Sequence, residues 1–318
     1  MGGSWLTRTL CSRLSNLGMS FSHVIYYMTY FIIFVIYRTL IIYSRILAAY
    51  KTHYKGEPMK KSCFGILAVL LATTLACSGC ITGGSNDNEL GLINEGKLVV
   101  GMEAQFPPFE IIRADGSFYG FDIALAEEIG KELGLTVVFV DTDFSSIIAA
   151  LNAQKFDVVI SGLTITEARA ESVFFSDSYF DAGLSMAVPI GSSIQDLEGL
   201  AGKRVGVQLG STGDLFATDL EGLGELKRYA HAPDAFMDMK NGNLDVIIND
   251  GVVSAPIVAA YPNDFMIVEG LVTVEEYGIA IAKSNPELLE KINDALAAIM
   301  ADGRYDAIYD EYITNWSE

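Results

Sequence analysis

The sequence predicts an α/β fold built as two lobes, each a mostly parallel sheet flanked by helices. The main observation is that short apolar runs alternate with amphipathic stretches from Lys97 onward, which is the pattern of successive βα units. A second cycle of the same kind begins at Arg204 and indicates a second, smaller lobe. With 318 residues, of which 51% are hydrophobic, the chain is long enough for two packed domains.

The first lobe is predicted from a strand over 98–102 and a helix that we expect Asp122 to cap. Apolar residues recur every four positions on this helix, as in a helix that lies on a sheet: Phe121, Leu125, Ile129 and Leu133. Next we expect a strand over 135–140, a helix over 145–154, a strand over 156–160 and a helix that begins near Thr166.

The second cycle is expected to contain a strand over 204–209, a helix that begins near Gly213, a helix over 234–241 and a strand over 244–248. Beyond it, the segment 277–282 predicts another strand, and two helices over 286–300 and 305–316 close the chain. We expect these last two helices to pack on the first lobe.

Charge divides the chain into two parts. Residues 1–80 carry eight Lys or Arg and one acidic residue, whereas residues 81–318 carry 13 basic and 39 acidic residues, a net charge near −26. Such a field repels phosphate, which disfavours nucleic acid and anionic lipid surfaces as partners, and we expect no nucleic-acid partner. The acidity indicates a solvated surface, with a salty habitat or the recruitment of cationic ligands as alternatives.

Cysteine and histidine usage limits the chemistry of the second part. The four cysteines all lie within the first 80 residues: Cys11, Cys63, Cys77 and Cys80. His231 is the one histidine after position 80. Disulfides and Cys/His zinc sites are therefore excluded from the soluble part, and a Ser-His-Asp triad is open only through His231. We expect no metal and no cofactor.

Residues 59–80 have the layout of a secretory signal: Met59 and two lysines, an apolar run, and small residues before Cys80. This layout resembles a lipoprotein processing site with Cys80 as the lipidated residue, although Cys77 stands where such sites usually have Leu. Cys77 is the alternative lipidated residue. Upstream, the apolar segment 24–48 is either a membrane helix or untranslated sequence before a true start at Met59.

Polar residues follow several predicted strands, where open α/β sheets bind ligands. They are Glu103, the run 161–164, the run 210–213 and Asp250, with Arg169 near a helix start. Arg169 supplies a cation for a carboxylate and Asp250 an anion for an ammonium, while the hydroxyls of Thr164 and Ser211 or Thr212 add hydrogen bonds. Together these groups predict a site for a zwitterion.

Each candidate also has a structural alternative. Arg169 is suited to a surface ion pair, Asp250 to a helix cap, and Ser211-Thr212 to an ordinary turn. Phe106 and Phe144 offer flat walls for a ligand side chain but equally suit a core. The glycines between positions 202 and 213 do not match a dinucleotide-binding fingerprint.

From about Lys97 to Trp316 the chain resembles the amino-acid-specific solute-binding proteins of ABC importers, in the glutamine, arginine, histidine and cystine group. The matching stretches are GMEAQFPPFE (101–110), GFD (120–122), DFSSIIAAL (143–151), SGLTITEAR (161–169), FSD (175–177), VGVQLGSTG (205–213), EYGIA (276–280) and 303–309. The resemblance implies a two-lobed clamshell, α/β in class, with two crossing hinge strands near 183–188 and 277–282.

The resemblance also implies roles for the candidate residues. Arg169 would bind the ligand carboxylate with the backbone at Thr164 and Thr212, and Asp250 the ammonium with Thr164 and the Gly162 carbonyl. The side chain would lie among Glu103, Phe106, Phe144 and Gln208, and Glu103 stands where these proteins usually have Asp. The predicted ligand-binding residues are Glu103, Phe106, Phe144, Ser161, Gly162, Thr164, Arg169, Gln208, Ser211, Thr212 and Asp250.

These observations predict a monomeric extracytoplasmic protein that delivers a polar or basic amino acid, glutamine or arginine above all, to an ABC permease. A dehydratase of prephenate-like acids and a ligand-sensing domain are the alternatives. The predicted organisation is an N-terminal extension (1–58), a lipoprotein signal (59–80), a linker (81–96), the first lobe (97–186), the second lobe (187–278) and a return to the first lobe (279–318).

Overall fold

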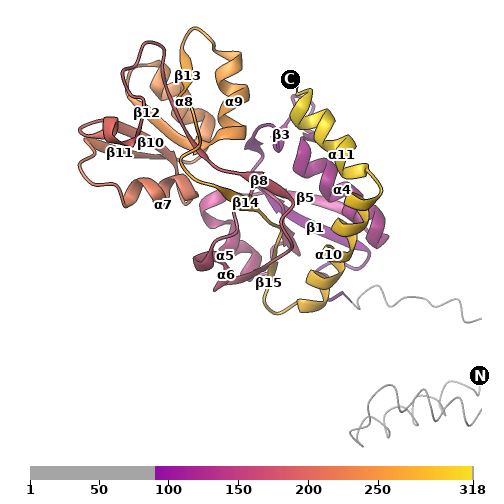
Figure 1. Cartoon of the computed structure of the whole chain (residues 1–318). Helices are drawn as coiled ribbons and strands as arrows, with labels where there is room; N and C mark the ends of the chain where they lie inside the picture. The colour runs from indigo at the N-terminus through magenta and orange to yellow at the C-terminus, as the bar shows by residue number, and fades with distance from the viewer. Residues whose placement is uncertain (1–89, 317–318) are drawn as a thin grey trace, which may run out of the picture. The chain divides into compact units, whose positions relative to one another are not determined.

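The computed structural model describes residues 90–316, so the predicted extension, signal and Cys80 lie outside the described residues. Within 90–316 the chain forms two sheets, each covered by helices on both faces, and these are the two lobes in Figure 1. No helix in this range is long and apolar enough to cross a membrane.

The first lobe is built on a five-stranded sheet of order β5-β1-β6-β15-β7. Its strands are β1 (Lys97–Met102), β5 (Thr136–Asp141), β6 (Val158–Val159), β7 (Val173–Phe175) and β15 (Ala280–Ala282). Its helices are α4 (Phe121–Leu133), η2 (Phe144–Ser146), α5 (Ile147–Asn152), α6 (Glu167–Ala170), α10 (Pro286–Ala301), α11 (Arg304–Tyr309) and η4 (Asp310–Thr314). A small sheet of β2 (Gln105–Phe106), β3 (Glu110–Ile112) and β4 (Phe118–Tyr119) follows β1.

The second lobe is built on a sheet of order β11-β10-β12-β9-β13. Its strands are β9 (Leu184–Pro189), β10 (Arg204–Gln208), β11 (Glu225–Tyr229), β12 (Val246–Asp250) and β13 (Phe265–Ile267). Its helices are η3 (Leu197–Leu200), α7 (Thr212–Thr218), α8 (Ala232–Lys240) and α9 (Gly251–Ala260). Apolar clusters fill both faces of each sheet, which accounts for the continuously buried strands.

Both sheets are mixed rather than parallel throughout. β1 pairs in parallel with β5 and β6, and β10 pairs in parallel with β11 and β12, as expected from βα alternation. β15 and β9 run antiparallel to their neighbours, because the chain enters each sheet there from the other lobe. The two α/β lobes of the prediction are confirmed.

The two lobes are joined by a short antiparallel pair, β8 (Phe180–Ala182) and β14 (Glu275–Tyr277), which crosses between them in Figure 1. The crossing strands had been expected slightly later, near 183–188 and 277–282. The structure instead gives those stretches to β9 and β15, which lie inside the sheets, and β9 runs across the predicted boundary between residues 186 and 187.

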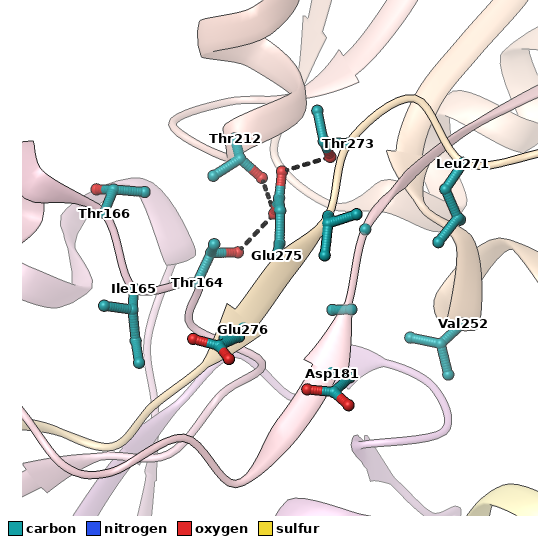
Figure 2. A pocket seen from close by; sticks show the side chains of 13 residues that line it. Thr164, Ile165, Thr166, Asp181, Thr212, Val252, Leu271, Thr273, Glu275 and Glu276 are labelled. Atoms are coloured by element: carbon teal, nitrogen blue, oxygen red, sulfur yellow. Dashed lines mark hydrogen bonds between the residues drawn. The ribbon is translucent and has the colours of Figure 1, made fainter.

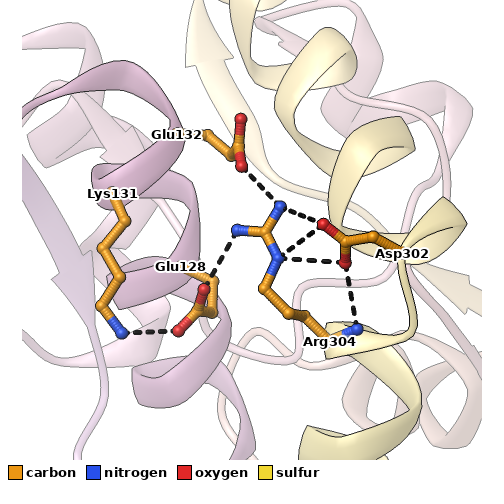
Figure 3. Close-up of polar contacts among 5 residues, drawn as sticks. All are labelled: Glu128, Lys131, Glu132, Asp302 and Arg304. Atoms are coloured by element: carbon orange, nitrogen blue, oxygen red, sulfur yellow. Dashed lines mark hydrogen bonds and ion pairs between the residues drawn. The ribbon is translucent and has the colours of Figure 1, made fainter.

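The closing helices return to the first lobe, as expected. Arg304 at the start of α11 donates hydrogen bonds to Glu128 and Glu132 of α4 and to its own neighbour Asp302, as Figure 3 shows. The Tyr305 hydroxyl donates to the Tyr179 carbonyl at 2.6 Å. The C-terminal segment is thereby fixed against α4.

The expected cap of α4 is wrong. Gly120 holds the N-cap position with a φ of 139°, and a side chain there would meet the Phe109 carbonyl oxygen at 2.1 Å. Asp122 is instead buried in the first turn, where its Oδ2 accepts from the Gly162 N–H at 2.7 Å and the Tyr179 hydroxyl at 2.9 Å. Asp122 therefore anchors the loop after β6 rather than the helix end.

Candidate ligand-binding site

The predicted polar residues gather where the two lobes meet. In the first lobe, Glu103 follows β1, and the run 161–164 follows β6. In the second lobe, Gln208 ends β10 and Asp250 ends β12. The Gln208 amide donates to Glu103 Oε2 at 3.0 Å, so the two sets face each other across the lobes, as the rule for open α/β sheets predicts.

Arg169 is a buried cation without a carboxylate partner. Its side chain is held by carbonyls of both lobes: Nη1 donates to Thr164 O at 2.8 Å and Nη2 to Gly210 O at 3.1 Å. The guanidinium carbon lies 5.5 Å from the centre of the Phe144 ring. No acidic group of residues 90–316 forms an ion pair with it. The surface ion-pair alternative is therefore excluded.

Asp250 carries the opposite charge, and it also has no ion-pair partner among the described residues. It occupies the N-cap position of α9, yet its side chain makes no capping bond, and within the described part of the chain Oδ1 is buried without a hydrogen-bond partner. Burial first, and then the charge of Glu275, raise the pKa of Asp250 to about 7, while the nearby Tyr277 hydroxyl and then the charge of Arg169 oppose the rise. Burial lowers the pKa of Arg169, with Asp250 as the main opposing charge.

Glu275 of β14 is a functional candidate that the sequence analysis missed. Its Oε2 accepts hydrogen bonds of 2.9 Å from the hydroxyls of Thr164 in the first lobe and Thr212 in the second, and its Oε1 accepts from Thr273 (Figure 2). The hydroxyls of the two threonines thus bind a carboxylate of the protein, whereas the resemblance assigns the ligand carboxylate to the backbone at these two residues. In the sequence, the adjacent acidic residues Glu275 and Glu276 before Tyr277 were the signal that could have indicated this role.

A pocket of about 800 Å³ opens beside this carboxylate. It is lined by residues of β8, of β14 and of the segment before β14, together with the turn after β6, as Figure 2 shows. Thr164 and Thr212 are the predicted ligand-binding residues that line it. The remaining predicted residues do not line it, and Phe106 and Phe144 belong to apolar clusters of the first lobe, in line with their structural alternative.

A second contact between the lobes surrounds Glu103, whose side chain is 2% exposed. Glu103 Oε1 lies 2.6 Å from His231 Nδ1, while Oε2 accepts from Gln208. Burial raises the pKa of Glu103, and the hydrogen bonds of His231 and Gln208 oppose that rise. The sequence analysis weighed His231 only as a triad member and missed this contact.

Two of the predicted hydroxyls are used inside their own lobes. Ser161 Oγ accepts from the Glu103 N–H at 3.0 Å and donates to Glu110 Oε1 at 2.6 Å. Ser211 Oγ caps α7 by accepting from the Asp214 N–H and donates to the Gln208 carbonyl. Ser161 and Ser211 therefore hold the site's backbone in this structure, and Ser211 matches its structural alternative.

The loop after β6 rests on buried acids. Gly162 adopts a φ of 49°, and a Cβ there would meet the Phe106 ring at 2.7 Å, so a larger residue would displace the ring. Beneath the loop, burial raises the pKa of Asp122 to about 6, and burial together with the charge of Asp122 raises the pKa of Glu110 well above its ordinary value.

The arrangement provides charges and hydrogen bonds from two lobes that are joined by β8 and β14, and these features are typical of a two-lobed binding protein. Residues 98–315 match the model of the bacterial extracellular solute-binding proteins, family 3. The chain belongs to this family. Membership confirms the prediction of an extracytoplasmic binding protein rather than an enzyme.

Individual relatives agree. The chain is 35% identical over 256 residues to the probable histidine-binding protein of Neisseria gonorrhoeae, which covers 78% of this chain and 94% of that protein. It is 33% identical over 220 residues to the ABC transporter arginine-binding protein 1 of Escherichia coli, covering 68% and 90%. An ancestral arginine-binding protein, solved with arginine and with glutamine, is 45% identical with a TM-score of 0.66, covering 68% or 69% of this chain and 98% of that one.

Proposed function

We propose that this protein binds a free amino acid with a polar or basic side chain, arginine above all, and delivers it to an ABC importer. One observation carries the proposal: Arg169 and Asp250 are buried at the meeting of the lobes, and neither has a described partner of opposite charge within ion-pair distance. Buried charges are costly unless paired. The carboxylate and ammonium of an amino acid supply both missing partners.

The side chain of the ligand would extend toward Glu103. A buried carboxylate beside the Phe106 and Phe144 walls favours a cationic side chain, whereas the Gln208 amide suits a neutral one such as glutamine. The relatives named above for histidine and arginine, and the ancestral protein solved with arginine and glutamine, support this range of ligands.

Binding would be linked to closure of the lobes. A ligand that contacts Arg169 and Asp250 gains interactions with both lobes only when they meet, so it stabilises the closed arrangement by differential affinity. The importer would then recognise the closed protein. The hinge pair β8 and β14 is short enough to allow this motion with few broken hydrogen bonds.

The test is titration calorimetry of the purified protein with each amino acid, paired with the variants Arg169→Ala and Arg113→Ala. Arg113 is exposed on the hairpin between β3 and β4, so R113A controls for loss of a positive charge and should bind normally. R169A should lose binding and keep its fold. Micromolar binding retained by R169A, or no binding of any amino acid by the unaltered protein, would contradict the proposal.

We further propose that Cys80 carries the lipid that anchors the protein to the outer face of the cell membrane. The signal-like segment 59–80 and the polar spacer after it support the proposal. Cells that express the protein and its Cys80→Ser variant should be compared after growth with a labelled fatty acid. Equal labelling of the two would assign the anchor elsewhere, with Cys77→Ser as the next variant.

A further inference from the structure

The carboxylate of Glu103 is fully occupied by groups of the opposite lobe. Its Oε1 lies 2.6 Å from His231 Nδ1, and its Oε2 accepts from Gln208 at 3.0 Å. His231 lies at the N-cap position of α8, and its side chain is 23% exposed against 2% for Glu103. A ligand cation that bonds to Oε1 of Glu103 must therefore replace His231, which is the more exposed of the two residues.

The other charged groups around Glu103 are acidic. Asp141 at the end of β5 accepts from the Ala104 N–H, and Glu110 of β3 is linked to the Glu103 backbone through Ser161. Both carboxylates act on Glu103 with the same sign of charge. Among the described residues, His231 is the one group bonded to Glu103 that can carry a positive charge.

We propose that His231 is a specificity-determining residue that competes with the basic side chain of the ligand for Glu103. Protonated His231 occupies the position of the ligand cation beside Glu103, whereas neutral His231 is displaced by that cation. This inference rests on the proposed function and names the substrate class of the same site: a cationic side chain is accepted in exchange for the imidazole proton.

Thermodynamic linkage between ligand binding and protonation of His231 then gives the direction in which pH changes the affinity. A cationic side chain beside Glu103 disfavours a second positive charge on His231, so binding of a cation releases a proton, and low pH weakens that binding. A neutral side chain of the same shape releases none. The affinity for a cationic side chain therefore rises with pH, and the affinity for a neutral side chain of the same shape does not.

Arginine and citrulline are the probes, since they match in length and differ in the charge of the terminal group. Calorimetry at pH 5.5 and 7.5 gives the ratio of the two dissociation constants, in which titration of Asp250 cancels because both ligands share the α-ammonium. The preference for arginine should rise severalfold from pH 5.5 to 7.5 in the unaltered protein. In His231→Gln, which keeps a hydrogen-bond donor but does not titrate, the rise should be smaller, because only the Glu103 carboxyl with its raised pKa is left to titrate beside the ligand cation.

If the ratio is constant in the unaltered protein, the inference is overturned without any variant. This outcome does not depend on whether H231Q folds well. An equal rise in the unaltered protein and in H231Q also overturns it, because the titrating group would lie elsewhere. If another amino acid binds but arginine and citrulline do not, the inference fails while the proposed function stands. If no amino acid binds, both fail.

Discussion

Asp250→Asn should stabilise the unliganded protein at high pH while removing ligand binding. Asp250 has a raised pKa of about 7 because it is buried, 5% exposed, and near Glu275. Between pH 4 and 7 the unfolded chain has this carboxyl ionised and the folded protein keeps it protonated. Stability from this group is therefore full below pH 4 and is lost as the pH rises to 7.

The size of this stability change follows from the pH interval between the unfolded and folded pKa values of Asp250. Each pH unit between the ordinary pKa of 3.8 and the raised value of about 7 corresponds to about 1.4 kcal/mol, so the upper bound is about 4 kcal/mol. The buried Asn amide lacks a partner at the Oδ1 position, which costs about 1–3 kcal/mol. Relative to the unaltered protein, D250N should then be about 1–3 kcal/mol more stable at pH 8 and about 1–3 kcal/mol less stable at pH 4, where only the cost of the Asn amide is left.

Urea unfolding at pH 4 and pH 8, without ligand, measures the difference. The matched control is Asp219→Asn, which removes the same charge at an exposed position after α7. Addition of arginine at pH 8 should stabilise the unaltered protein by about 2.7 kcal/mol at 100 times the dissociation constant, and D250N far less. If D250N gains no more than D219N between pH 4 and pH 8, Asp250 is not an uncompensated buried charge.

Three further changes test the supports of the site. Gly162→Ala should lose about 1–3 kcal/mol in urea unfolding, because φ is 49° and the new Cβ meets the Phe106 ring; an unchanged midpoint would refute this. Tyr179→Phe removes the hydroxyl bonded to Asp122 and should lose about 1.5–3 kcal/mol at pH 8 but less at pH 5, since the pKa of Asp122 is about 6. Arg304→Ala should lower the midpoint more at low salt than in 1 M NaCl, and equal losses would exclude an electrostatic role.

The sequence was most informative about residues at strand ends. Asp250 was chosen because polar groups after parallel strands converge, and Arg169 because it lies near a helix start that follows such a group; the structure buries both where the lobes meet. The elements around them were predicted within a few residues, because apolar periodicity reports burial directly. Their ligand contacts stay predictions, since the structure describes the protein alone.

Other features depend on contacts that no local pattern encodes. Asp122 has the spacing of a helix cap, yet its partners are 40 and 57 residues away. His231 and Glu275 meet their partners only after the chain has crossed between lobes, at separations of 128 and 111 residues. Pairings of this kind follow from tertiary packing and leave no periodic signal.

The position of β15 also determines when the protein can fold. This strand lies between β6 and β7, so the sheet of the first lobe is incomplete until residues 280–282 are available. The strands of the second lobe, by contrast, all come from residues 184–267 and precede β15 in the chain. Synthesis therefore yields a second lobe that can form early and a first lobe that must wait for nearly the whole chain. For an extracytoplasmic protein, the sheet of the first lobe can therefore be completed only once residues 280–282 have crossed the membrane.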